Sequence, residues 1–237
     1  MINSNDFEKH EFTGKRGLTL PYRLYEPAGV FDSPRPLLVF LHGAGERGTD
    51  NEKTLNGVSP FAPEYAIDFE KYGAYFLVPQ CPVDMQWVNT PFDSGVYLQT
   101  DTPLSLPLET AQELIDFIAD EYAIDTSRLY LMGASMGGYG TWDSVTRFPG
   151  KFRAAMPICG GADPSVSDRL KAAGTDIWTF HGDADNTVPP KGTRAMVAAL
   201  EKLGANITYS EYPGVGHGVW IEVHKTKIVY DWLFSKR

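Results

Sequence analysis

Short apolar segments alternate with amphipathic segments along most of the chain. Segments such as PLLVFLH and RLYLMGA are apolar at nearly every position, which is typical of strands that are covered on both faces of a sheet. On this basis we predict strands at residues 18–26, 36–42, 74–79, 128–133, 153–159, 177–181 and 207–212.

Apolar residues recur at helical spacing between these strands. The pattern predicts helices at 108–121, 137–147 and 219–234, and one within 189–205 that starts with proline and ends at Gly204. Alternating strands and helices indicate the α/β class. We expect one domain over 1–237 with a mostly parallel central sheet and helices on both faces. Ligands then bind at the carboxyl ends of the strands.

Two segments interrupt the alternation. Residues 46–66 and 82–107 are rich in proline, asparagine, aspartate, glycine and threonine, and each follows the carboxyl end of a predicted strand. Long loops in that position are usually functional, so we expect them to form walls of a site. Neither loop has a helical period, and we therefore predict no large cap domain.

Composition narrows the class of partner. Hydrophobic residues make up 43% of the 237 positions and charged residues 22%, which is typical of a soluble globular protein. The formal net charge of −9 disfavours nucleic acid and anionic membrane surfaces as partners. A neutral small molecule is compatible with it, and no sequence feature indicates an oligomeric state.

Cysteine, histidine and the N-terminal residues carry few signals. Cys81 and Cys159 are too few for a disulfide scaffold, and we interpret them as free buried thiols, with a single disulfide between them as the alternative. The five histidines do not cluster at metal-ligand spacing, so we expect neither a metal nor another cofactor. The segment MINSNDFEKHEF has no apolar core of a signal peptide, and no run is long enough to span a membrane. We expect a cytoplasmic protein, or a secreted one if a signal was removed or if the sequence is a domain of a larger secreted chain.

The segment GAGERG, residues 43–48, matches the G-x-G-x-x-G pattern of dinucleotide-binding sites. Such a site needs a helix directly after the glycines and an acidic residue about 20 residues further on. The residues that follow are polar and broken by proline, and the next strand ends LVPQ without a carboxylate. We therefore interpret the glycines as letting the backbone approach a reacting carbonyl group. Glu46 and Arg47 are interpreted as a stabilising ion pair, with a direct substrate contact as the alternative.

The strongest chemical signal is GASMG, residues 133–137. It is a G-x-S-x-G motif between an apolar strand and a helix, the setting in which Ser135 is held out as a nucleophile on a sharp turn. Gly133 and Gly137 fit there because they lack Cβ atoms. The helix that follows places free N–H groups beneath the serine, where they favour developing negative charge.

A serine nucleophile needs a base, and in this fold the order along the chain is serine, acid, histidine. His217 lies in a glycine-rich loop after the last strand, the expected place for the base. His181 ends a strand, where we expect it to fix the following turn, and His224 lies within a helix as a surface or packing residue. We prefer Asp185 as the acid and leave Asp183 and Asp163 open as alternatives.

A tetrahedral intermediate needs hydrogen-bond donors for its oxyanion. One candidate is the backbone N–H of Met136, directly after the serine. The second candidate is the N–H of Ala44, with Gly45 as a possible additional donor in the loop His42-Gly43-Ala44-Gly45.

The segments LHGAGERG, PQCP…W, GASMGGYG, HGDADNTVP and GVGHGVW occur in the order found in small serine esterases of the α/β-hydrolase superfamily. The chain most resembles the group labelled predicted peptidases, related to feruloyl esterases, acetyl-xylan esterases, esterase D and polyhydroxybutyrate depolymerases, from about residue 17 onward. The resemblance implies ester hydrolysis through an acyl-enzyme, without metal or cofactor. It makes Ser135 the nucleophile, Asp185 the acid and His217 the base, with Ala44 and Met136 as oxyanion donors.

Substrate preference depends on the walls of the site. Trp87 and Trp220 are candidate substrate-binding residues, with ordinary packing as the alternative for each. We expect a carboxylesterase for short acyl or hydroxycinnamoyl (feruloyl-type) esters, either small molecules or groups linked to a polysaccharide. The alternatives are a serine peptidase or acyl thioesterase with the same three residues, and a non-catalytic binding domain, which the intact set of residues disfavours.

Overall fold

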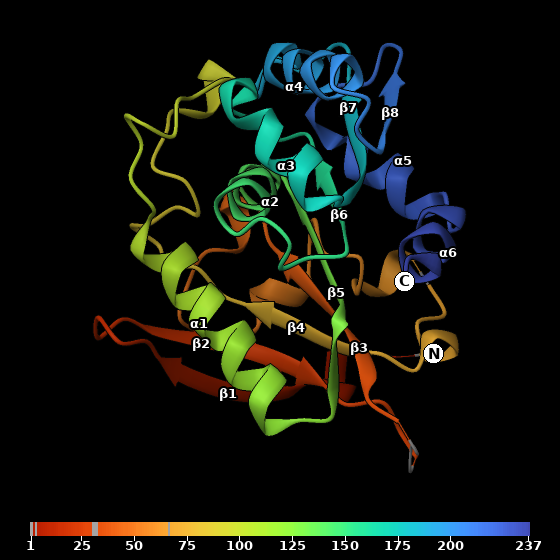
Figure 1. Cartoon of the computed structure of the whole chain (residues 1–237). Helices are drawn as coiled ribbons and strands as arrows, with labels where there is room; N and C mark the ends of the chain where they lie inside the picture. Colours follow the sequence, from red (N-terminus) through yellow and green to blue (C-terminus); the bar gives the residue numbers. More distant parts are fainter. Residues whose placement is uncertain (1, 3, 30–32, 66) are drawn as a thin grey trace.

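The chain forms an eight-stranded sheet with helices on both faces, in a computed structural model that describes residues 2, 4–29, 33–65 and 67–237 (Figure 1). The strand order is β1-β2-β4-β3-β5-β6-β7-β8, and only β2 runs antiparallel to its neighbours. This arrangement confirms the predicted fold class. The strands are β1 Glu8–Thr13, β2 Thr19–Tyr25, β3 Arg35–Leu41, β4 Tyr75–Pro79, β5 Ile124–Ala134, β6 Ala154–Ile158, β7 Asp176–Gly182 and β8 Ile207–Tyr212.

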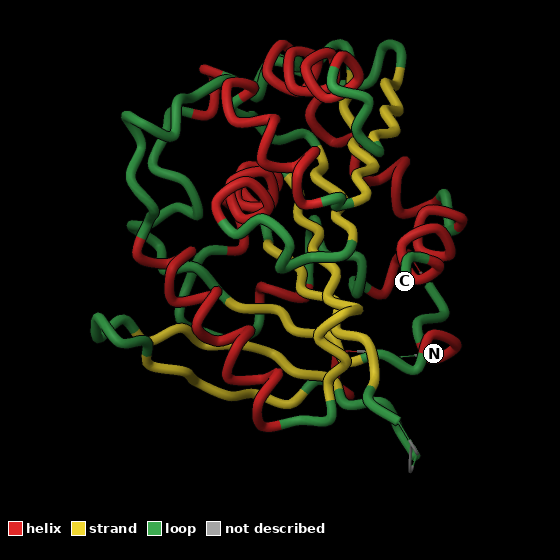
Figure 2. The backbone as a smooth tube through the Cα atoms, viewed as in Figure 1, coloured by secondary structure: helices red, strands yellow, loops and turns green. Residues whose placement is uncertain are grey.

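The helices form two layers, one on each face of the sheet. Figure 2 shows the strands running between them. Helices α1 to α4 lie on one side, and α5 and α6 on the other (Figure 1). None of the helices in the described ranges is long and apolar enough to cross a membrane. The helices are α1 Leu106–Glu121, α2 Met136–Arg147, α3 Ser167–Ala173, α4 Lys191–Lys202, α5 Trp220–Lys225 and α6 Ile228–Ser235.

Strand β3 shows why the central strands are apolar throughout. Leu37 and Val39 belong to the core cluster on the side of α1 and α2, while Leu38 and Phe40 belong to the cluster on the side of α5 and α6. Successive side chains of a strand point to opposite faces, and here both faces are covered. All four side chains are fully buried. The two-layer cover therefore explains the continuous hydrophobic runs of the sequence.

The structure adds two elements to the predicted ones and divides one predicted helix into two. Strand β1 was not predicted, because this edge strand reads EKHEFT and pairs only with β2, so it needs no apolar run. Helix α3 was missed because seven residues are too few to show a helical period. The single helix expected over 219–234 is two helices, because the chain leaves helical geometry at Thr226, whose hydroxyl donates to the Glu222 carbonyl.

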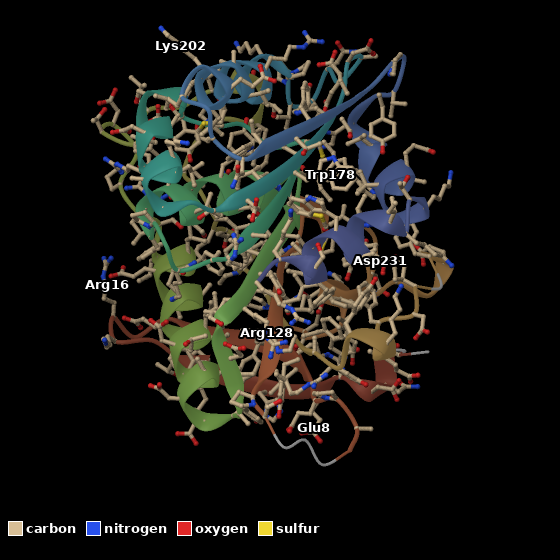
Figure 3. The ribbon with its side chains drawn as sticks, turned by 45° about the vertical axis from the view of Figure 1, so that its right-hand side comes forward. Glu8, Arg16, Arg128, Trp178, Lys202 and Asp231 are labelled. Atoms are coloured by element: carbon tan, nitrogen blue, oxygen red, sulfur yellow. The ribbon has the colours of Figure 1, made fainter. Side chains whose placement is uncertain are left out.

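Ion pairs connect the outer elements to the helices. Arg16, in the turn between β1 and β2, donates to Glu109 on α1 at 2.7 Å, and its label in Figure 3 marks the tip of this turn. Asp231 on α6 accepts hydrogen bonds from Lys71 and Tyr72 at 2.6 and 2.8 Å. Figure 3 shows Asp231 and Trp178 on the same side of the molecule. These contacts hold the edge hairpin and the segment before β4 against the helices.

A buried carboxylate on α2 anchors the second long loop. Asp143 accepts hydrogen bonds from the Tyr97 hydroxyl at 2.8 Å, from Gln99 Nε2 at 3.0 Å and from Arg147 Nε at 2.7 Å. Burial raises the pKa of the Asp143 carboxyl, and the Arg147 guanidinium opposes that rise. The Gln99 N–H also donates to Asp163 beyond β6. These hydrogen bonds therefore hold this part of the 82–107 loop in a fixed position. Before α1 begins, the described residues of the loop form only one short 3₁₀ helix.

We predict that Asp143→Asn lowers the free energy of unfolding by about 3 kcal/mol, because it leaves the Arg147 guanidinium without its counter-charge. Urea denaturation at pH 7 measures the loss. Asp231→Asn is the control: it breaks the ion pair with Lys71, in which both side chains are about half exposed, and exposed pairs contribute little. Equal, small losses in the two variants would contradict the anchoring role of Asp143.

Candidate active site

Ser135 occupies a sharp turn between β5 and α2. Its backbone has φ 58° and ψ −118°, a conformation that residues other than glycine rarely adopt. A Cβ atom on Gly133 would lie 2.4 Å from the Gly137 carbonyl oxygen, and one on Gly137 would lie 1.8 Å from the Leu41 carbonyl oxygen. Only glycine fits at these two positions. The turn therefore brings the end of β3 into contact with the start of α2.

Three side chains from separate strand ends form a continuous hydrogen-bonded series. Ser135 Oγ lies 2.8 Å from His217 Nε2, and His217 Nδ1 lies 2.7 Å from Asp185 Oδ2. A carboxylate accepts only, so Nδ1 carries the proton and Nε2 is left to accept from the serine hydroxyl. The histidine is thus held in the tautomer that can take a proton from Ser135.

The Asp185 carboxylate is held on both of its oxygens. Its Oδ1 accepts the N–H groups of Thr187 and Val188, each at 2.9 Å, and its Oδ2 also lies 3.3 Å from His181 Nε2. Burial alone would raise the pKa of this carboxyl, but the hydrogen bonds from His181 and His217 hold the pKa well below its usual range. Asp185 therefore stays ionised and oriented toward His217.

The other two candidate acids accept hydrogen bonds from backbone N–H groups. Asp183 accepts the Gly214 N–H at 2.7 Å, and Asp163 accepts the N–H groups of Gln99 and Ser165 at 2.7 and 2.9 Å. Neither is hydrogen-bonded to His217 in the structure. Of the three carboxylates left open by the sequence, Asp185 is the one placed beside the histidine.

The two other histidines after Ser135 are buried. His181 Nδ1 lies 2.9 Å from Thr193 Oγ1 and its Nε2 lies 2.9 Å from the Val188 carbonyl, so it fixes the turn that carries Asp185. His224 is fully buried between the Val58 carbonyl and the Tyr230 hydroxyl. His224 is thus a packing residue rather than a surface one.

The candidate oxyanion donors are the backbone N–H groups of Ala44 and Met136. Each residue is the first of a helical segment, a short 3₁₀ helix at Ala44–Glu46 and α2 at Met136. First-turn N–H groups have no acceptor within their own helix. Within the described residues, no other hydrogen-bond acceptor is found for either group. Both are therefore available to a ligand at the end of the sheet.

The two candidate substrate tryptophans differ in position. Trp220 is partly buried and meets the His217 ring edge-on, with 5.4 Å between ring centroids. The prediction for Trp87 is wrong, because its side chain is fully buried and offers no surface for stacking. Trp87 Nε1 donates instead to the His42 carbonyl at 3.1 Å. The sequence could not distinguish a loop tryptophan that lines a pocket from one that lies beneath it.

The expected ion pair between Glu46 and Arg47 is absent from the described contacts. Arg47 Nε donates to the Ala44 carbonyl at 2.9 Å, and its Nη1 lies 3.4 Å from the Met85 carbonyl. Burial raises the pKa of the Glu46 carboxyl, and the N–H groups of Val58 and Gly43 oppose the rise. The Arg47 side chain therefore braces the backbone of this segment, whereas the buried Glu46 Oε2 has no hydrogen-bond partner among the described residues.

Sequence reasoning gave no role to Cys159, which lies beside this series. Its sulfur, the Asp185 carboxylate and the His217 ring lie within 4.8 Å of one another, a donor set that could hold a transition metal. A cation there would have to replace the 2.7 Å hydrogen bond between His217 and Asp185. Burial raises the pKa of the Cys159 thiol, which disfavours a thiolate ligand. Cys81 and Cys159 are free and buried, as predicted.

Comparison with known proteins supports this assignment of the fold and the class of enzyme. The sequence model of the Dienelactone hydrolase family matches residues 96–231. A probable carboxylesterase of Oryza sativa subsp. japonica is 30% identical over 201 residues, which cover 78% of this chain and 72% of that protein. A bifunctional acetylxylan esterase/xylanase of Neocallimastix patriciarum is 26% identical over 190 residues, which cover 78% of this chain and 23% of that protein.

A solved structure extends the similarity to the whole fold. The crystal structure of a thermostable esterase has 37% sequence identity and a TM-score of 0.87, covering 98% of this chain and 63% of that chain. This chain thus spans less than two thirds of the solved esterase. These similarities confirm the resemblance to esterases of the α/β-hydrolase superfamily.

We predict that Asp185→Asn lowers the free energy of unfolding at pH 7 by about 2 kcal/mol, because the amide cannot replace the charged acceptor on Oδ2. The pKa of Asp185 is depressed in the folded state, so its contribution is present above the unfolded pKa of about 4 and is lost as pH falls further. Denaturation curves from pH 7 to pH 2 should show the two proteins converging below about pH 4. If the difference in free energy of unfolding between the two proteins stays unchanged down to pH 2, the ionised Asp185 carboxylate is not the source of the stabilisation.

Proposed function

Because this chain belongs to the Dienelactone hydrolase family, within the α/β-hydrolase superfamily, we propose that it is a serine carboxylesterase. The observation that carries the proposal is the hydrogen-bonded series Ser135–His217–Asp185, with both distances under 3 Å. The probable carboxylesterase and the thermostable esterase described above support hydrolysis of esters as the reaction class.

In the proposed mechanism Ser135 Oγ attacks the ester carbonyl carbon while His217 Nε2 takes its proton. The carbonyl oxygen becomes an anion that accepts hydrogen bonds from the N–H groups of Ala44 and Met136. His217 then gives its proton to the leaving alcohol, and Asp185 holds the imidazolium in place. Water, activated by His217, hydrolyses the acyl-enzyme and restores the serine. These steps use no metal and no cofactor.

The proposed substrates are short-chain acyl or hydroxycinnamoyl esters, free or attached to a polysaccharide. Three observations support this class. The 82–107 wall is held in place through Asp143, and Trp220 is next to His217. The described residues of both long loops form no α-helix before α1 begins at Leu106, and so none that could close over a long chain. The similarity to an acetylxylan esterase also favours small acyl groups, which we extend to this chain as a proposal.

We predict that Ser135→Ala lowers kcat for 4-nitrophenyl acetate by at least about 1,000-fold without unfolding the protein. A fluorophosphonate probe should label the wild type at Ser135 and leave the variant unlabelled. Ser127→Ala, which removes a hydroxyl bonded to Asp125 at the far end of the same strand, is the matched control and should keep full activity. Undiminished turnover in Ser135→Ala, or labelling at another residue, would overturn the assignment of the nucleophile.

A panel of esters tests the substrate class. We predict the highest kcat/KM for acetyl to butyryl esters or methyl ferulate, and at least a tenfold lower value for dodecanoyl esters. The reason is that the described residues of the two long loops form no helical cap to cover a long chain. Peptide amides and acyl thioesters of the same acyl groups complete the panel and address the alternative reactions. Faster cleavage of a peptide than of every ester would favour the serine peptidase interpretation.

A further inference from the structure

His42, the residue directly before the glycine-rich loop, has a fully buried ring with a defined partner on each nitrogen. The backbone N–H of Cys81 donates to His42 Nε2 at 2.9 Å, and His42 Nδ1 lies 2.6 Å from the carbonyl oxygen of Gly43. The ring therefore joins the end of β3 to the segment that follows β4. No role for this ring follows from the three residues of the proposed mechanism.

The partners fix the protonation state of the ring. Because Cys81 donates to Nε2, that nitrogen has no proton, and because the Gly43 carbonyl only accepts, Nδ1 carries one. The imidazole is thus neutral. Burial, as the larger cause, lowers the pKa of His42 to about 4, so the same tautomer persists at neutral pH.

The bond to Gly43 determines the direction of the next N–H group. The carbonyl of Gly43 and the N–H of Ala44 belong to one peptide unit, which is planar and trans, so the two groups point in opposite directions. Holding the carbonyl against the His42 ring turns the Ala44 N–H away from that ring. The neighbouring peptide is fixed too, since Trp87 Nε1 donates to the His42 carbonyl.

The same segment is in contact with the turn at Ser135. A Cβ on Gly137 would lie 1.8 Å from the Leu41 carbonyl oxygen and 2.8 Å from the His42 carbonyl oxygen. The end of β3 therefore packs directly on the first turn of α2, which supplies the Met136 N–H. A rotation of the Gly43–Ala44 peptide would change one wall of the oxyanion site without moving Ser135, His217 or Asp185.

We propose that His42 is a positioning residue for ester hydrolysis: its Nδ1–H, bonded to the Gly43 carbonyl, holds the Ala44 N–H in the direction required to stabilise the oxyanion. The inference rests on the proposed function, since it assigns how one donor of that site is oriented. His42 acts through the peptide and does not touch the substrate.

Two substitutions separate the bonds of the ring. His42→Asn keeps a donor near the position of Nδ1 and loses the acceptor for the Cys81 N–H. His42→Gln places an acceptor near the position of Nε2 and loses the donor to Gly43. We expect kcat to fall about 100-fold in His42→Gln, with KM within about threefold of the wild-type value. In His42→Asn we expect kcat to fall less than about tenfold. The reason is that a misplaced oxyanion donor reduces stabilisation of the transition state more than it reduces substrate binding.

The direct readout is the hemiketal formed with 1,1,1-trifluorobutan-2-one and followed by ¹⁹F NMR. Ser135 Oγ adds to the ketone carbon, His217 takes the hydroxyl proton, and the former carbonyl oxygen becomes an anion in the oxyanion site. We expect the pKa of this adduct oxygen to rise by about two pH units in His42→Gln and by less than one in His42→Asn, matching the losses in kcat.

Gln112→Leu is the control for a purely structural role, since it removes a buried hydrogen bond to Ser144 between α1 and α2. It should lower Tm and leave the adduct pKa unchanged. An unchanged adduct pKa in His42→Gln, or equal losses in the two His42 variants, would overturn the proposal. A wild type that forms no hemiketal and no fluorophosphonate adduct would instead refute the proposed function, so the two failures are distinguishable.

Discussion

The left-handed backbone at Ser135 is the constraint on which the rest of the site depends. A non-glycine residue at φ 58° costs of the order of 1–3 kcal/mol, and it persists only where the surroundings fix it. Here the Ser135 N–H donates to the Ile158 carbonyl of β6 at 2.9 Å, and Gly133 and Gly137 meet without Cβ atoms. The turn starts α2 at the next residue, so its free N–H groups lie beside the serine.

The turn after β7 holds Asp185, and Asp185 in turn holds His217. Asp185 is bound by two backbone N–H groups of its own turn and contacted by His181, and His217 is oriented in turn by Asp185. Because the strands are parallel, their carboxyl ends meet at one edge of the sheet, and residues 82 positions apart come within hydrogen-bond distance. A rigid scaffold that places three short side chains at neighbouring strand ends therefore explains how the series forms.

The 82–107 loop connects the wall of the site to the oxyanion segment. Ser105 Oγ donates to the Trp87 carbonyl, and Trp87 Nε1 donates to the His42 carbonyl. The Trp87 indole, which we expected to contact the substrate, instead supports the backbone at His42. The middle of the loop is bonded to Asp143 on α2 through Tyr97 and Gln99, and Trp87, near its start, is bonded to the backbone just after β3.

The sequence by itself determined the features that depend on local pattern: the apolar runs of the central strands, the helix after GASMG, the serine–acid–histidine order and the glycines that permit the turn. The edge strand β1 and the seven-residue α3 were missed because neither needs a strong pattern of its own. Only the tertiary structure decided which of three aspartates meets His217, that Trp87 lies under the wall, and that the His42 ring holds the Gly43 carbonyl. Those outcomes depend on which residues distant in the chain are brought together when both faces of the sheet are covered, and no local pattern encodes a contact of that kind.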